Sequence, residues 1–372
     1  MSLRTCVTKG AHDRCKFSPL SAARRGPSRK TLSETARPQL LIGALGIEES
    51  CFVDRADADA GSVEEGSVQY SKRNMERLHN LLLAACLLVC ASASSSFPSV
   101  AEGRVQLSNG NSLWYRIVRP ALLTAQRPPL LVCHGGPQVP SDYLFDLERV
   151  GPPDRACIFF DQLGCGRSDL PPAGSDAYSL KASVSDLRTV ISSLGLERYH
   201  LYGQSWGGLL AFLHLTSPLD GTDASSSSSA EAISLTLSNT PTSVPLVEAE
   251  AGRLIADECE GEVSNFMAKH NYRGGPDQPP QLAAAYAHAG TTWRGTAAIA
   301  GLEASAEAMA ECNLPALVVR GEHDFCTQAC VEGWRGLPNV MFETIDGASH
   351  HSLLEDPERY LQVLSSFLEA HD

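Results

Sequence analysis

The chain carries a serine between two glycines where a predicted strand gives way to a helix. Residues 203–207 read Gly-Gln-Ser-Trp-Gly and match the pattern G-x-S-x-G. Residues 199–202 before them read as a short buried strand, and residues 207–213 begin an apolar helix. The pattern alone is short enough to occur by chance, so its weight comes from this context. In that context it predicts a tight turn that presents Ser205 as a nucleophile, with the amino end of a helix beside the developing oxyanion.

A nucleophilic serine needs a general base and a group that orients that base. Two predicted strands downstream, residues 315–321 and 339–345, are each followed by a loop that contains such groups. Adjacent residues point in different directions, so we expect one acid from the first loop and one histidine from the second. The residues alone leave both choices open. The candidates are Glu322 or Asp324, and His350 or His351.

An acyl-transfer site also needs a second backbone donor for the oxyanion. Residues 129–133 form an apolar run typical of a buried strand, and residues 134–137 after it read His-Gly-Gly-Pro. Glycines there let backbone amides approach a substrate oxygen. A glycine-rich loop can bind phosphate instead, but no G-K-[ST] follows, which disfavours a P-loop.

Five short motifs occur in the order found in one enzyme family. They are H-G-G-P at 134–137, D-Q-x-G-x-G-x-S at 161–168, G-x-S-W-G-G at 203–208, G-x-x-D at 321–324 and G-x-x-H at 347–350. From about residue 102 to the end, the chain therefore resembles the proline iminopeptidases, or prolyl aminopeptidases, a branch of the α/β-hydrolases. The resemblance implies an α/β-hydrolase fold: a mostly parallel central sheet flanked by helices, with a helical cap inserted after the sixth core strand.

The resemblance also implies roles for individual residues. The G-x-x-D and G-x-x-H spacings select Asp324 and His350 as the partners of Ser205. Ser205 would attack, His350 would carry the proton and Asp324 would orient His350. The oxyanion donors would be the amides of Gly136 and Trp206, and Gly135 would contact substrate. The implied enzyme is an aminopeptidase that releases N-terminal proline or a small residue from a peptide or amino-acid amide, without a metal or organic cofactor.

The chain departs from the family pattern in three places. Gln138 replaces the last glycine of H-G-G-P-G, and Ala289 replaces a methionine in the cap. Where the family has a glutamate that helps to hold the substrate amino group, residues 291–294 read Thr-Thr-Trp-Arg. Glu248 and Glu250 are substitute candidates, although acids on an exposed helix face are usually only solvated. These departures leave two alternatives open: an esterase or amidase of the same fold for small acyl substrates, and a catalytically weak relative that binds a partner.

The domain boundaries follow from these assignments and from composition. The hydrolase core is expected at 98–240 and 313–372, with the helical cap at 241–312. Residues 75–97 are signal-like, and residues 1–74, which lack sustained periodicity, are a disordered extension or a gene-model artefact.

The segment from Met75 to Ala93 has a basic start, a short apolar run and an A-x-A-like end. It predicts the secretory route, or a plastid reached through it. If the segment is not a signal, the protein is expected in the cytoplasm. The apolar run is too short for a stable membrane span.

Charge and cysteine content narrow the possible partners. The formal net charge of −13 argues against nucleic-acid binding, and a small peptide remains the expected partner. The 12 cysteines form no C-x-x-C pair, which disfavours a zinc ribbon or thioredoxin-like site. We expect Cys133 and Cys157 to be small core residues and Cys326 and Cys330 to be free thiols. Nothing in the composition indicates an oligomeric state.

Overall fold

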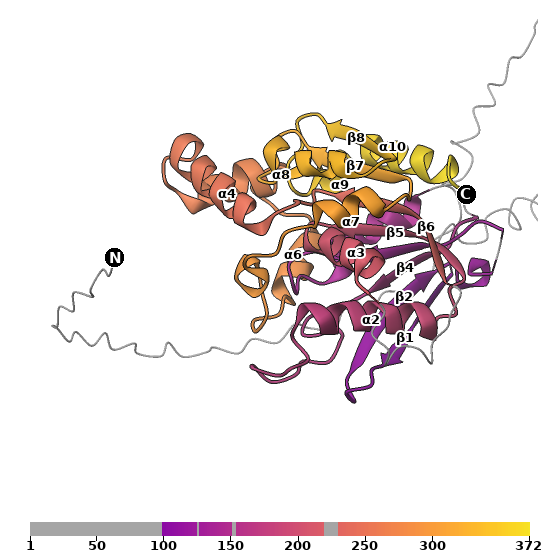
Figure 1. The fold of residues 1–372 in the computed structure, drawn as a ribbon. Helices are drawn as coiled ribbons and strands as arrows, with labels where there is room; N and C mark the ends of the chain where they lie inside the picture. The colour runs from indigo at the N-terminus through magenta and orange to yellow at the C-terminus, as the bar shows by residue number, and fades with distance from the viewer. Residues whose placement is uncertain (1–98, 125, 151–153, 219–229) are drawn as a thin grey trace, which may run out of the picture. The chain divides into compact units, whose positions relative to one another are not determined.

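The computed structural model describes residues 99–124, 126–150, 154–218 and 230–372 (Figure 1). The predicted extension at 1–74 and the whole signal-like segment at 75–97 lie outside these residues. No helix within the described residues is long and apolar enough to cross a bilayer.

The described residues form an eight-stranded sheet in the order β1-β2-β4-β3-β5-β6-β7-β8. The edge strands β1 (Val100–Gln106) and β2 (Ser112–Val118) are antiparallel to each other, and β2 is antiparallel to β4. All other neighbours pair in parallel. The parallel strands are β3 (Leu130–Cys133), β4 (Cys157–Phe160), β5 (Arg198–Gln204), β6 (Glu231–Ser238), β7 (Ala316–Gly321) and β8 (Val340–Ile345).

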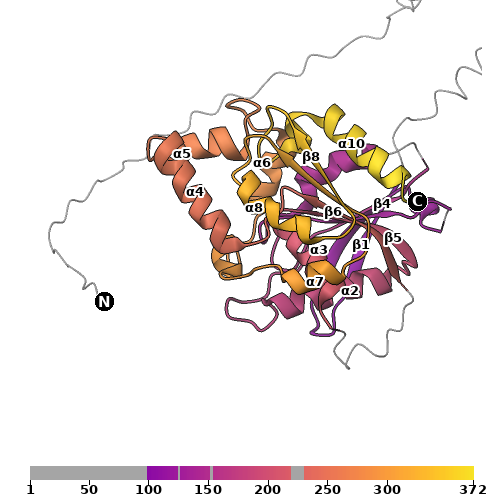
Figure 2. The ribbon, with the colours of Figure 1, turned by 45° about the horizontal axis from the view of Figure 1, so that its top comes forward.

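Successive strand residues point to opposite faces of the sheet, and here the residues on both faces are apolar. Helices therefore cover both faces. Leu131 and Cys133 of β3 pack in the cluster that contains α2 (Leu180–Ser193) and α3 (Trp206–Thr216). Leu130 and Val132 pack instead against η2 (Ser141–Arg149) and α10 (Pro357–Glu369). Figure 2 shows α10 on one side of the sheet and α2 on the other. The predicted mostly parallel sheet flanked by helices is confirmed.

A helical insert separates β6 from β7, as predicted for the segment after the sixth strand. In Figure 1 its helix α4 stands to one side of the sheet, with α6 below it. The insert includes a π-helical turn, η3, directly after α5. Its elements are α4 (Val244–Glu258), α5 (Val263–Phe266), η3 (Met267–Asn271), α6 (Pro280–Ala287), η4 (Thr296–Ile299) and α7 (Ala306–Glu311).

The remaining short elements are η1 (Pro120–Leu122), α8 (Gln328–Glu332), η5 (Gly333–Gly336) and α9 (Ser352–Glu355). Cys133 and Cys157 are buried in β3 and β4, and neither forms a disulfide, which confirms their prediction as core residues. Cys326 and Cys330 are also free, as predicted.

Candidate active site

Ser205 occupies a sharp turn between β5 and α3. Its backbone has φ 54° and ψ −123°, a combination that non-glycine residues rarely adopt. Its amide donates a hydrogen bond to the carbonyl oxygen of Ser238, at 2.8 Å. A Cβ at Gly203 would lie 2.2 Å from the carbonyl oxygen of Gly207, and one at Gly207 would lie 2.1 Å from that of Cys133. The flanking glycines are therefore required because the backbone segments nearly touch.

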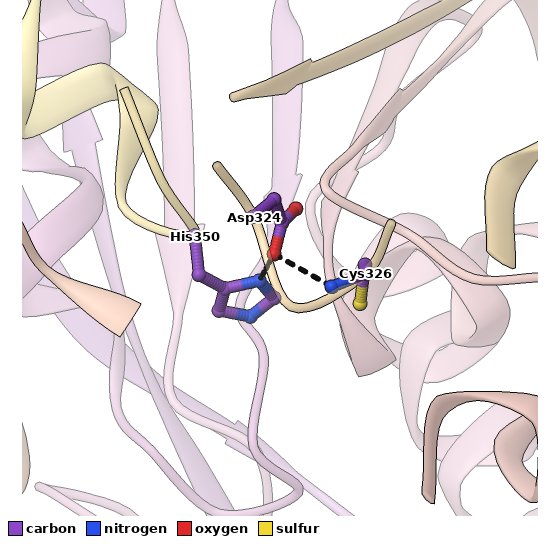
Figure 3. A group of neighbouring side chains, drawn as sticks. All are labelled: Asp324, Cys326 and His350. Carbon is purple, nitrogen blue, oxygen red and sulfur yellow. Dashed lines mark hydrogen bonds and ion pairs between the residues drawn. The ribbon is translucent and has the colours of Figure 1, made fainter. Parts of the chain in front are cut away.

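Asp324 and His350, from the loops after β7 and β8, form a buried pair. The Nδ1 atom of His350 lies 2.7 Å from Oδ1 of Asp324 (Figure 3). The same oxygen accepts a hydrogen bond from the Cys326 amide at 2.9 Å, and Oδ2 accepts one from Nδ2 of Asn239 at 2.7 Å. Three donors thus compensate a carboxylate that is 2% exposed. With Nδ1 facing the carboxylate, Nε2 is the nitrogen of His350 that can receive a proton.

The structure separates the alternatives that the sequence left open. Glu322 is exposed, and its carboxylate accepts a hydrogen bond from the Gly347 amide at 2.8 Å. His351 is buried, and its Nε2 lies 3.0 Å from the hydroxyl of Tyr286. Burial lowers the pKa of His351 well below its ordinary value. Asp324 is therefore paired with His350, and neither Glu322 nor His351 contributes to this pair.

Cys326 brings a third potential metal ligand to this pair. One ligand atom from each of Asp324, Cys326 and His350 lies within 4.8 Å of the others. However, the carboxylate and the imidazole are already hydrogen-bonded to each other, and burial raises the pKa of the Cys326 thiol well above its ordinary value. A thiolate is the form that binds metals. The group therefore has the geometry of an acid–base pair with a neutral thiol beside it.

Gln204, directly before Ser205, connects three loops of the site. Its Nε2 donates to the main-chain carbonyl of His350 at 3.2 Å. Its Oε1 accepts from the hydroxyl of Tyr143 at 2.7 Å, and that hydroxyl accepts from the Gly135 amide at 2.8 Å. This chain of hydrogen bonds brings the serine turn, the histidine loop and the His-Gly-Gly-Pro loop together. Neither Gln204 nor Tyr143 was identified from the sequence.

The two predicted oxyanion donors lie on segments that are tied to each other. Trp206 is the first residue of α3, so its amide has no carbonyl partner within the helix. Its indole Nε1 donates to Oε1 of Gln162 at 2.8 Å. Gln162 in turn donates from Nε2 to the carbonyl of His134 at 2.7 Å, in the loop that carries Gly136. These contacts fix the Gly136 loop relative to α3.

Gly135, predicted to contact substrate, is buried and already hydrogen-bonded within the protein. Its amide donates to Tyr143, and its carbonyl accepts from the Val139 amide at 3.3 Å. Gly136, one residue on, is half-buried and has φ 118°. The structure therefore makes Gly136, and not Gly135, the residue of this loop that is accessible.

The acids of α4 differ in their surroundings. Glu248 is exposed on this helix. The carboxylate of Glu250 accepts from Oγ1 of Thr327 at 3.0 Å and pairs with Arg253 at 3.0 Å. The hydrogen bond from Arg253 lowers the pKa of Glu250. Glu250 is thus engaged in holding α4 to the loop before α8, and the structure brings neither acid into contact with Ser205 or His350.

The helical insert contacts the histidine loop directly. The carbonyls of His270 and Asn271, at the end of the π-helical turn η3, accept from the amides of His350 and His351, each at 3.2 Å. The ring of Phe325 lies on the imidazole of His350, with 4.0 Å between centroids and 30° between planes. π-Helical turns are rare and often occur at functional sites. The position of His350 thus depends on the insert as well as on the sheet.

Asn239 and Phe325 were also not identified from the sequence. Asn239 lies just beyond β6, in a left-handed conformation with φ 51°. The available signal was its place at the carboxyl end of a predicted strand, next to the serine strand. No local pattern marks Phe325 as the ring that covers His350.

Comparisons with known proteins identify the family of this fold. The profile of the "Alpha/beta hydrolase family" matches residues 130–363. A proline iminopeptidase of Lactobacillus delbrueckii subsp. bulgaricus is 29% identical over 293 residues, which cover 70% of this chain and 96% of that protein. One from Clostridium botulinum is 27% identical over 282 residues, or 70% of this chain and 95% of that protein.

Two solved structures resemble the fold at 25% sequence identity. The crystal structure of VinJ has a TM-score of 0.63 and covers 74% of this chain and 100% of its own. A proline iminopeptidase of Mycobacterium smegmatis has a TM-score of 0.58, with 73% of this chain and 98% of its own covered.

Proposed function

Because the chain belongs to the α/β hydrolase family, we propose that it is a serine hydrolase with Ser205 as nucleophile, His350 as base and Asp324 as the residue that orients the base. The observation that carries the proposal is the 2.7 Å contact between His350 and Asp324. Gln204 ties the main chain of His350 to the strained turn of Ser205.

The proposed reaction is the acyl transfer that a Ser-His-Asp triad performs. Oγ of Ser205 attacks the carbonyl carbon of the substrate, and Nε2 of His350 takes the hydroxyl proton. The carboxylate of Asp324 stabilises the imidazolium that forms. The amides of Gly136 and Trp206 donate to the oxyanion, and His350 returns the proton to the leaving group. Water, activated by His350, then releases the acyl group from Ser205.

For the substrate, we propose a peptide or amino-acid amide from which an N-terminal proline or another small residue is released. The support is the set of proline iminopeptidases that match along nearly their whole length. In this activity the acyl group transferred to Ser205 carries a free amino group.

An esterase or amidase for small acyl substrates is the second candidate, and the sequence of residues 291–294 in the insert favours it. Residues 291–294, where the family has a glutamate that helps to hold the substrate amino group, contain no acid. This leaves an acyl group without an amine as a reasonable substrate.

Two measurements test these proposals. A fluorophosphonate probe should label the protein, and Ser205→Ala should abolish labelling and lower kcat by roughly 10⁴-fold or more. Labelling that persists in the variant would refute the assignment of Ser205. Proline and alanine arylamides should then be compared with short acyl esters. Turnover of the esters without turnover of either arylamide would favour the second candidate.

A further inference from the structure

Two of the three positions at which the chain departs from the family pattern contact each other. Oε1 of Gln138 accepts a hydrogen bond from the Trp293 amide at 3.1 Å. The main-chain carbonyl of Gln138 accepts one from the Gly290 amide at 2.9 Å. Nε2 of Gln138 donates to the carbonyl of Leu163 at 3.3 Å. Gln138 is 1% exposed, and of these contacts the one with half-buried Trp293 is part-buried.

The surroundings of Gln138 fit its side chain closely. A Cβ at Gly164 would lie 2.0 Å from Nε2 of Gln138, and one at Gly290 would lie 2.2 Å from Oε1. The side-chain amide is therefore enclosed by glycine backbone on two sides. Gln138 itself has φ 63°, a left-handed conformation that costs energy in any residue other than glycine. The strain is tolerated in a buried residue whose side-chain amide and main-chain carbonyl are all hydrogen-bonded.

Trp293 extends the contact from Gln138 to the serine turn. Its ring packs edge-to-face against Trp206, with 5.6 Å between centroids and 83° between planes. Trp206 follows Ser205 and carries one of the proposed oxyanion donors. Gln138 lies two residues after Gly136, which carries the other. The Gln138–Trp293 contact is thus linked to both proposed donor segments. Gln138 is joined to Gly136 along the chain, and the indole ring of Trp293 packs against Trp206.

We propose that Gln138 is a positioning residue that latches insert residues 290–293 onto the Gly136 loop and holds Trp293 against Trp206. Gln138 and Trp293 then act as one unit, so these two departures from the family pattern are not independent losses of function. This argues against the alternative that the chain is a catalytically weak relative that binds a partner. The inference rests on the proposed function only for its effect on catalysis. The latch itself is a contact between the insert and the core.

Gln138→Gly tests the latch without adding backbone strain, because glycine adopts φ 63° freely. The variant should lower kcat for a short acyl ester by about tenfold, with a smaller change in KM, since small displacements of catalytic groups cost this much or more. Trp293→Ala should have a similar effect. If the two residues act as one unit, the double variant should lose no more than about the larger single loss. Glu260→Gly is the matched control, because Glu260 is left-handed at φ 57° but exposed.

Hydrogen exchange gives a reading that does not depend on activity. In Gln138→Gly the Trp293 amide loses its acceptor and should exchange faster, whereas the Gly290 amide keeps its main-chain acceptor and should change less. Unchanged exchange at Trp293, unchanged kcat, or a double variant whose loss is the product of the single losses would each overturn the proposal. If the wild-type protein does not react with the fluorophosphonate probe, the proposed function fails, and hydrogen exchange still decides whether the latch exists.

Discussion

The strained backbone of Ser205 predicts that replacing this proposed nucleophile with glycine can stabilise the fold. Its φ of 54° and ψ of −123° place it where a non-glycine residue costs about 1–3 kcal/mol. Ser205→Ala keeps that cost, whereas Ser205→Gly removes it. Glycine also makes the unfolded chain more flexible, which costs about 0.4–1 kcal/mol relative to alanine. The glycine variant should therefore be more stable than the alanine variant by about 1 kcal/mol.

The comparison isolates the backbone, because both variants lack the hydroxyl and both should be inactive. Urea denaturation should give a higher midpoint for Ser205→Gly than for Ser205→Ala, with the same slope. Thermal unfolding should shift in the same direction by about 2–4 °C, as expected for 1 kcal/mol in a domain of this size. Equal midpoints, or a lower one for the glycine variant, would show that the turn stores no strain at Ser205.

Three further predictions concern other parts of the chain. Burial raises the pKa of Asp186 from 3.8 to about 7, so between these values the folded protein holds a proton that the unfolded chain has released. The contribution of Asp186 to stability should therefore fall as the pH rises from about 4 to 7, and Asp186→Asn should be more stable than wild type at pH 8 by up to about 4 kcal/mol; equal urea midpoints at pH 8 would contradict this. Asn239→Gly keeps the left-handed backbone but removes a donor to Asp324, which should cost roughly 1.5–3 kcal/mol of stability and lower kcat more than KM; full activity would show that Asp324 is held without it. We also propose that residues 75–93 are a cleaved signal, so a chain that starts at residue 98 should fold and keep full activity; an intact mass of the native protein that includes residues 1–74 would refute cleavage.

The parts of the fold that could be predicted from the sequence depend on local patterns. The strands before Ser205, Asp324 and His350 are short runs rich in apolar residues, and each is followed by a loop that carries one of these side chains. The choice of Asp324 over Glu322, and of His350 over His351, came from motif spacing in a family resemblance. The structure adds the physical reason, since Glu322 is solvated and His351 is turned toward Tyr286.

The remaining site residues depend on strand order, which no local pattern contains. In the sheet, β6 lies between β5 and β7. The residue that follows β6 is therefore placed between the serine turn and the Asp324 loop, and that residue is Asn239. Asn239 precedes Asp324 by 85 positions, and this order brings the two residues near enough for their 2.7 Å contact. The same reasoning explains why the Gln204–His350 link, across 146 positions, could not be predicted.

The helical insert adds a second dependence that strand order does not explain. Its π-helical turn accepts hydrogen bonds from the amides of His350 and His351, and residues 290–293 contact Gln138 beside the Gly136 loop. The insert therefore contacts the loop of His350, the proposed base, and the loop of Gly136, a proposed oxyanion donor. A substitution that shifts the insert should then change kcat as well as substrate choice. For this reason, replacing Trp293 alone to change specificity at the insert should also lower kcat, because the ring at position 293 is the group that packs against Trp206.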